Sequence, residues 1–461
     1  KCGGTLAAIA RVESARAETA QAGFDALLKM RASMLQLPEQ PVRRIGFVSF
    51  RISGTDGVSL EIGKWSEILE RMGYECFYVC GYSDRPEDKT CLIEEADFQH
   101  PDIAEINRQC FGRIHRPPEI SSLIRSTAGR IKEQLHSAIH ALDLDLLIAE
   151  NCLAIPMNIP LGSALEDIVV ETRIPCIAHH HDFVWERQRY TVNAVQDYLH
   201  AVFPPPLPEI GHVVISSLAG EEFGRRTGLP YDVVPNVMNF DEPPPAPDEY
   251  ASDFRESFGI GPDDFLILQP TRVVPRKGIE HTIELIRHLD DPRCRLMITH
   301  NYTDEGNGYY ERIRSYARLL GVEVIFATAR IGHRRHIGPD GRKCYSIWDA
   351  YPHADLIAYP STYEGFGNAF LEAIHFRKPV FCNRYTIFQT EIEPLGFCCA
   401  AMNGFLTDRV VEEVRALLLD NDRREVMVEH NYQLARRYFS YNRVENELRR
   451  LLSPPWAASR S

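Results

Sequence analysis

The stretch DLIAYPSTYEGFGNAFLEAIHFRKPVFCN, residues 355–383, holds the pattern that decides the fold. It begins with an apolar run of strand length, turns at Gly365 and Gly367, and opens a helix near Asn368 before a second apolar run. Unalternating apolar strands separated by helices indicate a parallel sheet with helices on both faces. The glycines let backbone amides approach a ligand, and the helix N-terminus adds partial positive charge. The stretch therefore predicts an α/β fold with an anion site at the end of a strand.

The same alternation continues outward from this stretch. Further strand candidates, separated by helix-length segments, lie at 44–50, 75–82, 144–150, 174–181, 212–217 and 231–236, and then at 265–270, 295–300 and 322–328. The two groups are separated by DEPPPAPDEY, residues 241–250, which has the composition of a linker. We therefore expect two Rossmann-like, doubly wound parallel-sheet domains that face each other across a cleft.

The expected domain organisation has four parts. An N-terminal helical extension covers 1–41, the first domain 42–242, the second domain 243–435, and a C-terminal helix at 436–461 packs back on the first domain. The last long helical stretch is expected to run from about Arg423 to Leu452.

Composition narrows the possible functions. The 461 residues are 44% hydrophobic and 25% charged, as in ordinary globular proteins. With 51 Lys and Arg against 64 Asp and Glu, the net charge of −13 argues against a nonspecific nucleic-acid binder. The 12 cysteines form no CxxC pair, which indicates reduced thiols in a cytoplasmic protein. No run approaches the ~18 apolar residues of a membrane helix.

Two carboxylates flank the glycine turn. Glu364 precedes it, Glu372 follows seven residues later, and carboxylates suit sugar hydroxyls because they accept several hydrogen bonds. The alternative is a surface loop residue and a solvated helix residue. Together with YSIWDAYPHADL (345–356) and KPVFCNRY (378–385), the segment resembles the donor-binding half of the retaining GT-B glycosyltransferases of the glycogen-synthase-like group, the glycosyl transferases group one.

This resemblance implies roles for the residues that match the family pattern. Glu364 would contact the hydroxyls of the donor sugar, and Glu372 would bind the ribose of the nucleotide. The main chain around the turn would face the diphosphate or the sugar, at Gly365, Phe366, Gly367, Asn368 and Ala369.

A second match is ILQPTRVVPRKGIEHTIELI, residues 267–286. Arg272 and Lys277 match the basic pair of the family, whose fixed cations would stabilise the negative charge that builds on the leaving diphosphate. A solvated basic loop is the alternative. Placement at the end of a strand and before the helix that starts near Gly278 favours the functional interpretation.

The first domain supplies two more matches. In SGTDGVSLEIGKW (53–65), Gly57 matches the glycine loop of the family, with Asp56 where a second glycine is usual. In IPCIAHHHDFVWERQRY (174–190), His181 matches the cleft histidine, expected to hydrogen-bond the sugar. A metal site of three adjacent histidines is disfavoured because neighbouring strand residues point to opposite faces, and a structural histidine is the other alternative. Ser216 and Asn236 are weaker matches, since a serine at a helix start is usually a cap.

The resemblance extends from about Arg44 to Leu452 and implies a retaining hexosyltransferase that uses a UDP-, GDP- or ADP-hexose without cofactor or metal. Asp143 and Asp145 fit a metal-binding Asp-x-Asp pattern but open an apolar strand with no third ligand nearby. The alternatives are another GT-B enzyme, such as a nucleotide-sugar epimerase or a phosphorylase, and a non-catalytic nucleotide-sugar-binding protein.

The expected acceptor is either a small molecule, for which cations beside the cleft would suit an anionic one, or a saccharide. Candidate acceptor-binding residues beside the cleft are Arg51, Asp56, Arg187 and Arg189. A basic segment with Arg330, Arg334, Arg335, Arg342 and Lys343 is either part of that site or a solvated loop. A lipid acceptor is less favoured because no basic amphipathic helix is present. Peripheral membrane contact and the oligomeric state stay open.

Overall fold

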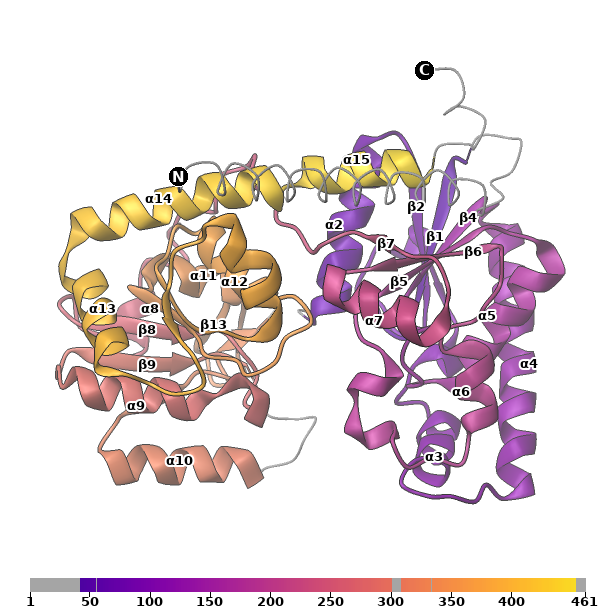
Figure 1. Cartoon of the computed structure of the whole chain (residues 1–461), viewed down its shortest axis with the longest axis horizontal. Helices are drawn as coiled ribbons and strands as arrows, with labels where there is room; N and C mark the ends of the chain where they lie inside the picture. Colours follow the sequence, from indigo (N-terminus) through magenta and orange to yellow (C-terminus); the bar gives the residue numbers. More distant parts are fainter. Residues whose placement is uncertain (1–41, 55, 301–307, 333, 453–461) are drawn as a thin grey trace, which may run out of the picture.

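The computed structural model describes residues 42–54, 56–300, 308–332 and 334–452. The described chain forms two lobes that lie side by side, each built on its own parallel sheet (Figure 1). The helix expected in residues 1–41 lies outside the described residues. The expected α/β class, with two doubly wound parallel sheets, is confirmed.

The sheet of the first lobe has seven parallel strands in the order β3-β2-β1-β4-β5-β6-β7. Their bounds are β1 (Arg44–Ser49), β2 (Glu75–Cys80), β3 (Thr90–Leu92), β4 (Leu146–Glu150), β5 (Cys176–His180), β6 (Ile210–Val214) and β7 (Asp232–Val233). The helices are α2 (Gly57–Arg71), α3 (Pro101–Cys110), α4 (Pro118–Ala141), α5 (Ile159–Thr172), α6 (Gln196–Val202) and α7 (Ser217–Thr227). The strand order reverses between β1 and β4, and ligands of such sheets bind at that point.

The sequence explains why these elements form. Every residue of β4 is buried, as expected for a central strand with helices on both faces. Helix α2 starts where Asp56 accepts a hydrogen bond from Ser59 N, and its Ile62, Trp65 and Leu69 pack on the sheet. Burial of this helix face fixes the loop between β1 and α2 at the carboxyl edge of the sheet.

The second lobe repeats the design with the strand order β10-β9-β8-β14-β15-β16. The strands are β8 (Phe265–Gln269), β9 (Cys294–Ile298), β10 (Val324–Phe326), β14 (Leu356–Tyr359), β15 (Val380–Asn383) and β16 (Ala400–Met402). The helices are α8 (Phe254–Ser257), α9 (Ile279–Leu289), α10 (Gly308–Leu320), α11 (Ile347–Ala350), α12 (Asn368–His375), α13 (Asp408–Leu419) and α14 (Asn421–Tyr438). Here the strand order reverses between β8 and β14.

A third, small sheet joins β11 (Ile331–Gly332), β12 (His336–Ile337) and β13 (Lys343–Ser346). This sheet and the short strands β3 and β16 are not among the strand candidates that the sequence indicates. Residues 241–250, the expected linker, contain neither helix nor strand.

The last helical stretch is not one helix. It breaks after α14, and α15 (Tyr441–Leu451) follows, because the main chain of Phe439 and Ser440 pairs with Met238 beside the linker. The Met238 N–H donates to the Phe439 carbonyl at 3.0 Å. Helix α15 packs on α2 of the first lobe, and α14 and α15 together run along one side of both lobes (Figure 1). Among the described residues, no helix is long and apolar enough to cross a membrane.

Candidate active site

The sequence-predicted residues gather beyond the carboxyl ends of strands at, or next to, the point where each sheet reverses its order. Arg51, Asp56 and Gly57 follow β1, and His181 follows β5. In the second lobe, Arg272 and Lys277 follow β8, and residues 364–372 follow β14. The chemical roles expected for these side chains stay predictions, while their contacts are as follows.

Glu364 lies between two cations. Its Oε1 accepts a hydrogen bond from Lys277 Nζ, and its Oε2 lies 3.1 Å from Arg276 Nη1. Burial acts to raise the pKa of this carboxyl, but the charges of Lys277 and Arg276 outweigh it and lower the pKa to about 2. Burial lowers the pKa of Lys277, against the opposing charge of Glu364. The cluster of two cations and one anion has a net positive charge, which suits a diphosphate.

Buried hydrogen bonds fix the main chain of Lys277. Its carbonyl accepts from Gln269 Nε2 at 3.0 Å, and Gln269 Oε1 accepts from Thr282 at 2.8 Å, all in the buried interior. Gly278 has φ +59, and a Cβ there would lie 2.4 Å from the Pro360 carbonyl oxygen. Glycine at this position therefore lets the β8 loop lie against the end of β14. Arg272, from the same loop, is exposed.

The glycine turn lies against the first lobe. A Cβ on Gly365 would lie 3.2 Å from the carbonyl oxygen of His181, and one on Gly57 would lie 3.7 Å from Asn368 Nδ2. Asn368, the first residue of α12, also accepts a hydrogen bond from Asn236 at 2.7 Å. The amide groups at the start of α12 thus lie where the two lobes meet.

The buried side of the turn has no room for side chains. Gly367 has φ +127, and a Cβ there would lie 2.5 Å from the hydroxyl of Tyr385. That hydroxyl donates to the carbonyl oxygen of Phe366 at 2.9 Å, and Phe366 is buried. Ala369 follows Asn368 in the first turn of α12.

Glu372 lines a cavity between the lobes. Tyr351 donates a hydrogen bond to its Oε2 at 2.5 Å, and burial raises the pKa of the carboxyl despite that bond. The cavity has a volume of about 430 Å³, within the range of small-molecule sites. Residues of both lobes line it, together with two residues that precede the linker. The lining residues are Gly54, Leu60, Gly63, Lys64, Glu67, Asp84, Arg85, Pro86, Met238, Asn239, Arg334, Trp348, Glu372 and Tyr441.

His181 is held by Glu150, the last residue of β4. The imidazole Nε2 of His181 lies 3.0 Å from Glu150 Oε2, and Nδ1 of His179 lies 3.1 Å from the same oxygen. Burial acts to lower the pKa of His181, but the hydrogen bond and charge of Glu150 outweigh it and raise the pKa. For His179 burial prevails and lowers the pKa. Burial raises the pKa of Glu150 less than the two imidazoles lower it, so the carboxylate is ionised.

The three consecutive histidines point to two faces of β5, as the sequence predicts. His179 and His181 face Glu150, whereas His180 Nε2 lies 2.9 Å from His212 Nδ1 on β6. One nitrogen or oxygen from each of Glu150, His179 and His181 lies within 4.8 Å of the others, so this trio has the geometry that a metal ion could use. Its 3.0–3.3 Å separations are also those of hydrogen bonds, which account for the arrangement without an ion.

The candidate acceptor-binding residues differ in their surroundings. Arg51 Nη2 lies 3.6 Å from Asp56, whose two oxygens also bond Ser59 and cap α2. Arg187 pairs with Asp182 at 2.6 Å. The Nε atoms of Arg51 and Arg187 are buried with no hydrogen-bond partner among the described residues. Arg189 is exposed and stacks over Tyr190, with its guanidinium 4.7 Å from the ring centre.

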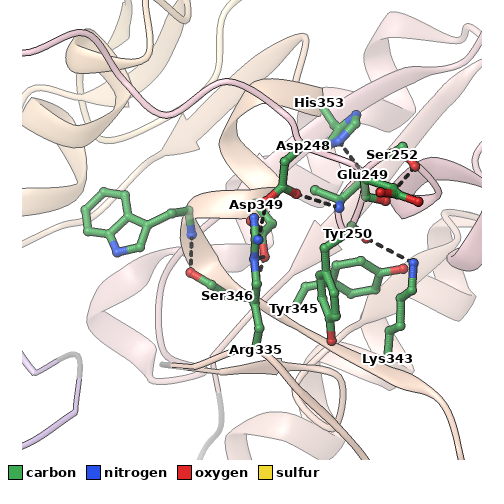
Figure 2. A network of polar contacts seen from close by, with 12 residues as sticks. Asp248, Glu249, Tyr250, Ser252, Arg335, Lys343, Tyr345, Ser346, Asp349 and His353 are labelled. Atoms are coloured by element: carbon green, nitrogen blue, oxygen red, sulfur yellow. Dashed lines mark hydrogen bonds and ion pairs between the residues drawn. The ribbon is translucent and has the colours of Figure 1, made fainter.

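Most of the basic segment is engaged inside the second lobe. Figure 2 shows Arg335 between Asp248 and Asp349, and Lys343 beside the main chain of Tyr250. Arg330 bonds the carbonyls of Lys343 and Ser257, and Arg342 pairs with Asp340 at 3.6 Å. Arg334 instead reaches the first lobe, 3.3 Å from the Asp84 carbonyl, and lines the cavity. The solvated-loop alternative is therefore too simple, since this segment holds the linker in place.

Other sequence candidates have structural roles. Ser216 caps α7 by accepting from Ala219 N at 3.2 Å, and Asp145 accepts from the Arg43 and Arg44 amides at 2.8 Å. Sequence reasoning missed Glu150 and Arg276. Glu150 ends the apolar run LLIAE, and an acid directly after a buried strand is a signal that it lies at the carboxyl edge of the sheet.

Comparison with known proteins adds to this geometry. The family described as Glycosyl transferases group 1 matches residues 251–434. Mannosylglucosylglycerate synthase of Thermotoga maritima is 31% identical to this chain over 443 residues, which cover 89% of the chain and 100% of the relative.

Solved structures share the arrangement of the two sheets. A glycosyltransferase from Rickettsia africae has a TM-score of 0.62 at 14% identity, covering 90% of this chain and 99% of that one. The Anabaena protein HepE in complex with UDP-glucose has a TM-score of 0.58 at 14% identity, covering 89% and 99%. At such identities the likeness shows the fold and nothing finer.

Proposed function

Because this chain belongs to the glycosyl transferases group 1 and is a retaining hexosyltransferase with the GT-B fold, we propose that it transfers a mannosyl or related hexosyl group to a glycosylated hydroxy acid such as glucosylglycerate. The donor is a nucleoside diphosphate sugar. The full-length likeness to mannosylglucosylglycerate synthase is the observation that supports this acceptor class.

The donor lies across the residues that follow β8 and β14. Lys277, Arg276 and Arg272 supply positive charge for the diphosphate, and the amides from Gly365 to Ala369 add hydrogen-bond donors. Glu364 orients the sugar hydroxyls while it stays ionised between Lys277 and Arg276.

Glu372 binds the ribose, and the base enters the cavity of about 430 Å³ that Glu372 lines. The UDP-glucose bound to Anabaena HepE is a donor of this class.

The reaction needs no protein nucleophile. The bond between the anomeric carbon and the phosphate oxygen breaks, and the acceptor hydroxyl attacks from the same face. Its proton passes to the leaving phosphate oxygen, so the nucleoside diphosphate leaves and configuration is retained. Fixed cations at the phosphate lower the barrier because they are stabilising where charge develops. The site proposed here requires neither a metal ion nor another cofactor.

The anionic end of the acceptor lies near the arginines of the first lobe. The side chains of Arg51 and Arg187 are partly exposed, at 35% and 30%. A carboxylate of the acceptor can therefore form a charge-assisted hydrogen bond with their guanidinium groups.

The test combines donors with matched acceptors. GDP-mannose, UDP-glucose and ADP-glucose are each incubated with glucosylglycerate or with glucosylglycerol, its neutral analogue, in the presence of EDTA. We expect acceptor-dependent release of nucleoside diphosphate with glucosylglycerate, at least tenfold faster than with glucosylglycerol, and an α-linked product from an α-linked donor. Absence of release with every donor contradicts the proposed acceptor class, and equal use of both acceptors contradicts its anionic character.

Substitutions of two arginines test where the anionic end of the acceptor binds. Arg51→Gln and Arg187→Gln are expected to raise KM for glucosylglycerate at least tenfold without raising KM for glucosylglycerol. Arg108→Gln is the matched control, because this exposed arginine of α3 pairs with Glu105 at 2.6 Å and is not among the candidate acceptor-binding residues. An unchanged KM in both test variants removes these two arginines from the acceptor site.

A further inference from the structure

Glu150 is a fully buried acid that none of the matched motifs contains. It ends β4, next to the point where the strand order of the first sheet reverses, and its side chain has no exposed surface. It therefore cannot touch a substrate directly. A buried carboxylate is costly unless it is paired, so its retention here requires a partner.

The hydrogen bonds of Glu150 define both histidine rings. An ionised carboxylate only accepts, so His181 Nε2 and His179 Nδ1, at 3.0 and 3.1 Å from Oε2, must each hold a proton. The His181 ring then has one nitrogen, Nδ1, that does not face Glu150. His179 stacks on Trp65 with ring centres 4.2 Å apart, and this contact fixes the other ring that Glu150 holds.

Asn151, the next residue, holds the main chain of the same histidine. Its side-chain Oδ1 accepts from the main-chain N–H groups of His181 at 3.0 Å and Asp182 at 3.1 Å. The main-chain N–H of Asn151 donates to the His179 carbonyl at 2.8 Å. Asn151 has φ +61, a left-handed conformation that asparagine tolerates better than most residues. The carbonyl of His181 lies against Gly365 of the glycine turn that follows β14. Side chain and main chain of His181 are thus both fixed from the end of β4.

We propose that Glu150 is a positioning residue that locks the His181 imidazole so that Nδ1 is presented to the donor sugar. This inference rests on the proposed role of His181 in the cleft. Glu150 holds Nε2, Asn151 holds the backbone, and His179 packs against the ring with centres 4.4 Å apart. The arrangement follows the general rule that a catalytic or binding imidazole is oriented by a partner on its other nitrogen.

Loss of the carboxylate is expected to act on turnover. In Glu150→Gln the amide can donate to an imidazole nitrogen, so the proton on Nε2 and the ring orientation are no longer specified. Partners of this kind are typically worth about 10–100-fold in activity. We expect kcat to fall by about that factor, with KM for the donor changed less than about threefold, because the diphosphate site in the second lobe is untouched.

A double-mutant cycle distinguishes positioning from structural support. If Glu150 acts through His181, then Glu150→Gln combined with His181→Asn has the same kcat as His181→Asn alone. The matched control is Glu209→Gln, a buried glutamate that precedes β6 and pairs with Arg173 at 2.7 Å. This control is expected to lower stability without changing kcat. Additive losses in the double variant overturn the proposal.

A second readout does not depend on turnover. In protein labelled with ¹⁵N-histidine, the NMR signals of the His181 ring should show a proton fixed on Nε2, and this signature should be lost in Glu150→Gln but retained in Glu209→Gln. An unchanged His181 signal in Glu150→Gln overturns the proposal even if no donor is turned over. One divalent ion per chain, lost in both Glu150→Gln and His179→Gln, overturns it in favour of a metal site.

Discussion

Glu364 is ionised because two cationic side chains from one short loop lie beside it. Lys277 and Arg276 lie in the segment between β8 and α9, and together they outweigh the burial that would otherwise neutralise the acid. Removing the carboxylate leaves a lysine that is 8% exposed without its partner, and breaking a buried ion pair in this way costs several kcal/mol. The stability of this site therefore depends on the same three side chains that are proposed to bind the donor.

Glu364→Gln is expected to lower kcat/KM by at least about 10²-fold and to lower the free energy of unfolding by about 3–5 kcal/mol. The reason is that Lys277 and Arg276 lose the anion between them, and the loop that carries residue 364 loses its fixed position. Donor turnover and urea unfolding of the same preparation measure the two effects.

Glu393→Gln is the control, since Glu393 and Arg384 form a pair at 2.6 Å in which both side chains are 35% exposed. It should change stability by less than about 1 kcal/mol. Near-wild-type turnover of Glu364→Gln contradicts the role proposed for this acid.

The residues of the site differ in how readable they are from the sequence. Glu364, Lys277 and the glycine turn stand out by spacing, because a turn between a strand and a helix is local. Arg276 lies one residue from Lys277, yet the sequence cannot tell which of two adjacent cations points at Glu364. The pairing of Glu150 with His181 depends on the register of β4 and β5, where Glu150 lies opposite His179, and register is a long-range property.

At the level of the element, successive histidine side chains at the end of β5 point to opposite faces of the sheet. The odd-numbered histidines face the site, and His180 faces His212 and the rings of Phe183 and Phe223 on the other side. Burial lowers the pKa of His180 well below its ordinary value and that of His212 to about 4. Both imidazoles are therefore neutral in the folded protein, beside an apolar cluster.

The His180–His212 pair makes the fold sensitive to acid. The unfolded chain takes up a proton on His212 near pH 6.5 and the folded chain only near pH 4, so the contribution of His212 is lost as the pH falls through this window. That loss amounts to about 3 kcal/mol for a pKa difference of this size. His212→Asn keeps an amide near the position of Nδ1 and removes the titration.

Urea unfolding at pH 7.5 and pH 4.5 tests this prediction. The stability of His212→Asn should fall less between the two pH values than that of the wild type. His115→Asn, at an exposed position, should follow the wild type. Equal pH dependence of all three proteins would show that His212 is not buried as a neutral group.

The turn between β8 and α9 depends on one glycine, Gly278. Gly278→Ala is expected to destabilise the protein by more than about 2 kcal/mol and to reduce turnover, because the new Cβ would meet the Pro360 carbonyl at 2.4 Å and displace Lys277. Gly228→Ala is the matched control, with φ +69 and no atom within 4 Å of the new Cβ. It should cost only the strain of the left-handed conformation, about 1 kcal/mol. Thermal unfolding and turnover measure the difference, and equal effects would argue against the close approach at Pro360.

At the scale of the whole molecule, the two lobes are joined twice. The chain passes from the first lobe to the second through residues 241–250 and returns at Phe439 and Ser440, beside Met238. The two-sheet architecture follows from the sequence, since it depends on many repeated apolar runs. The break between α14 and α15 does not follow from the sequence, because the helical periodicity continues across it. The pairing of the main chain with Met238 ends α14.

Helix α15 completes the core of the first lobe. Val444 and Leu448 are fully buried against a cluster that includes Ile62 and Trp65. Leu448→Ala is expected to lower the stability of the first lobe by about 2–5 kcal/mol, as for other large-to-small core changes. Calorimetry combined with limited proteolysis would assign the loss to that lobe.

Leu419→Ala, in α13, is the control, because Leu419 is 56% exposed and should change stability by less than about 0.5 kcal/mol. Cleavage that begins in the second lobe of Leu448→Ala would contradict the assignment of α15 to the first lobe.

The return of α15 also sets the order in which a newly made chain can finish folding. The strands of the first lobe emerge from the ribosome some 200 residues before Tyr441–Leu452. This later segment completes the hydrophobic cluster that contains Trp65. At ordinary elongation rates of about 5–20 residues per second, that gap lasts about 10–40 s. During this interval the nascent first lobe keeps an apolar face uncovered, and exposed apolar surface of this kind favours aggregation until α15 emerges. The core of the first lobe is thus completed only after the second lobe has been synthesised.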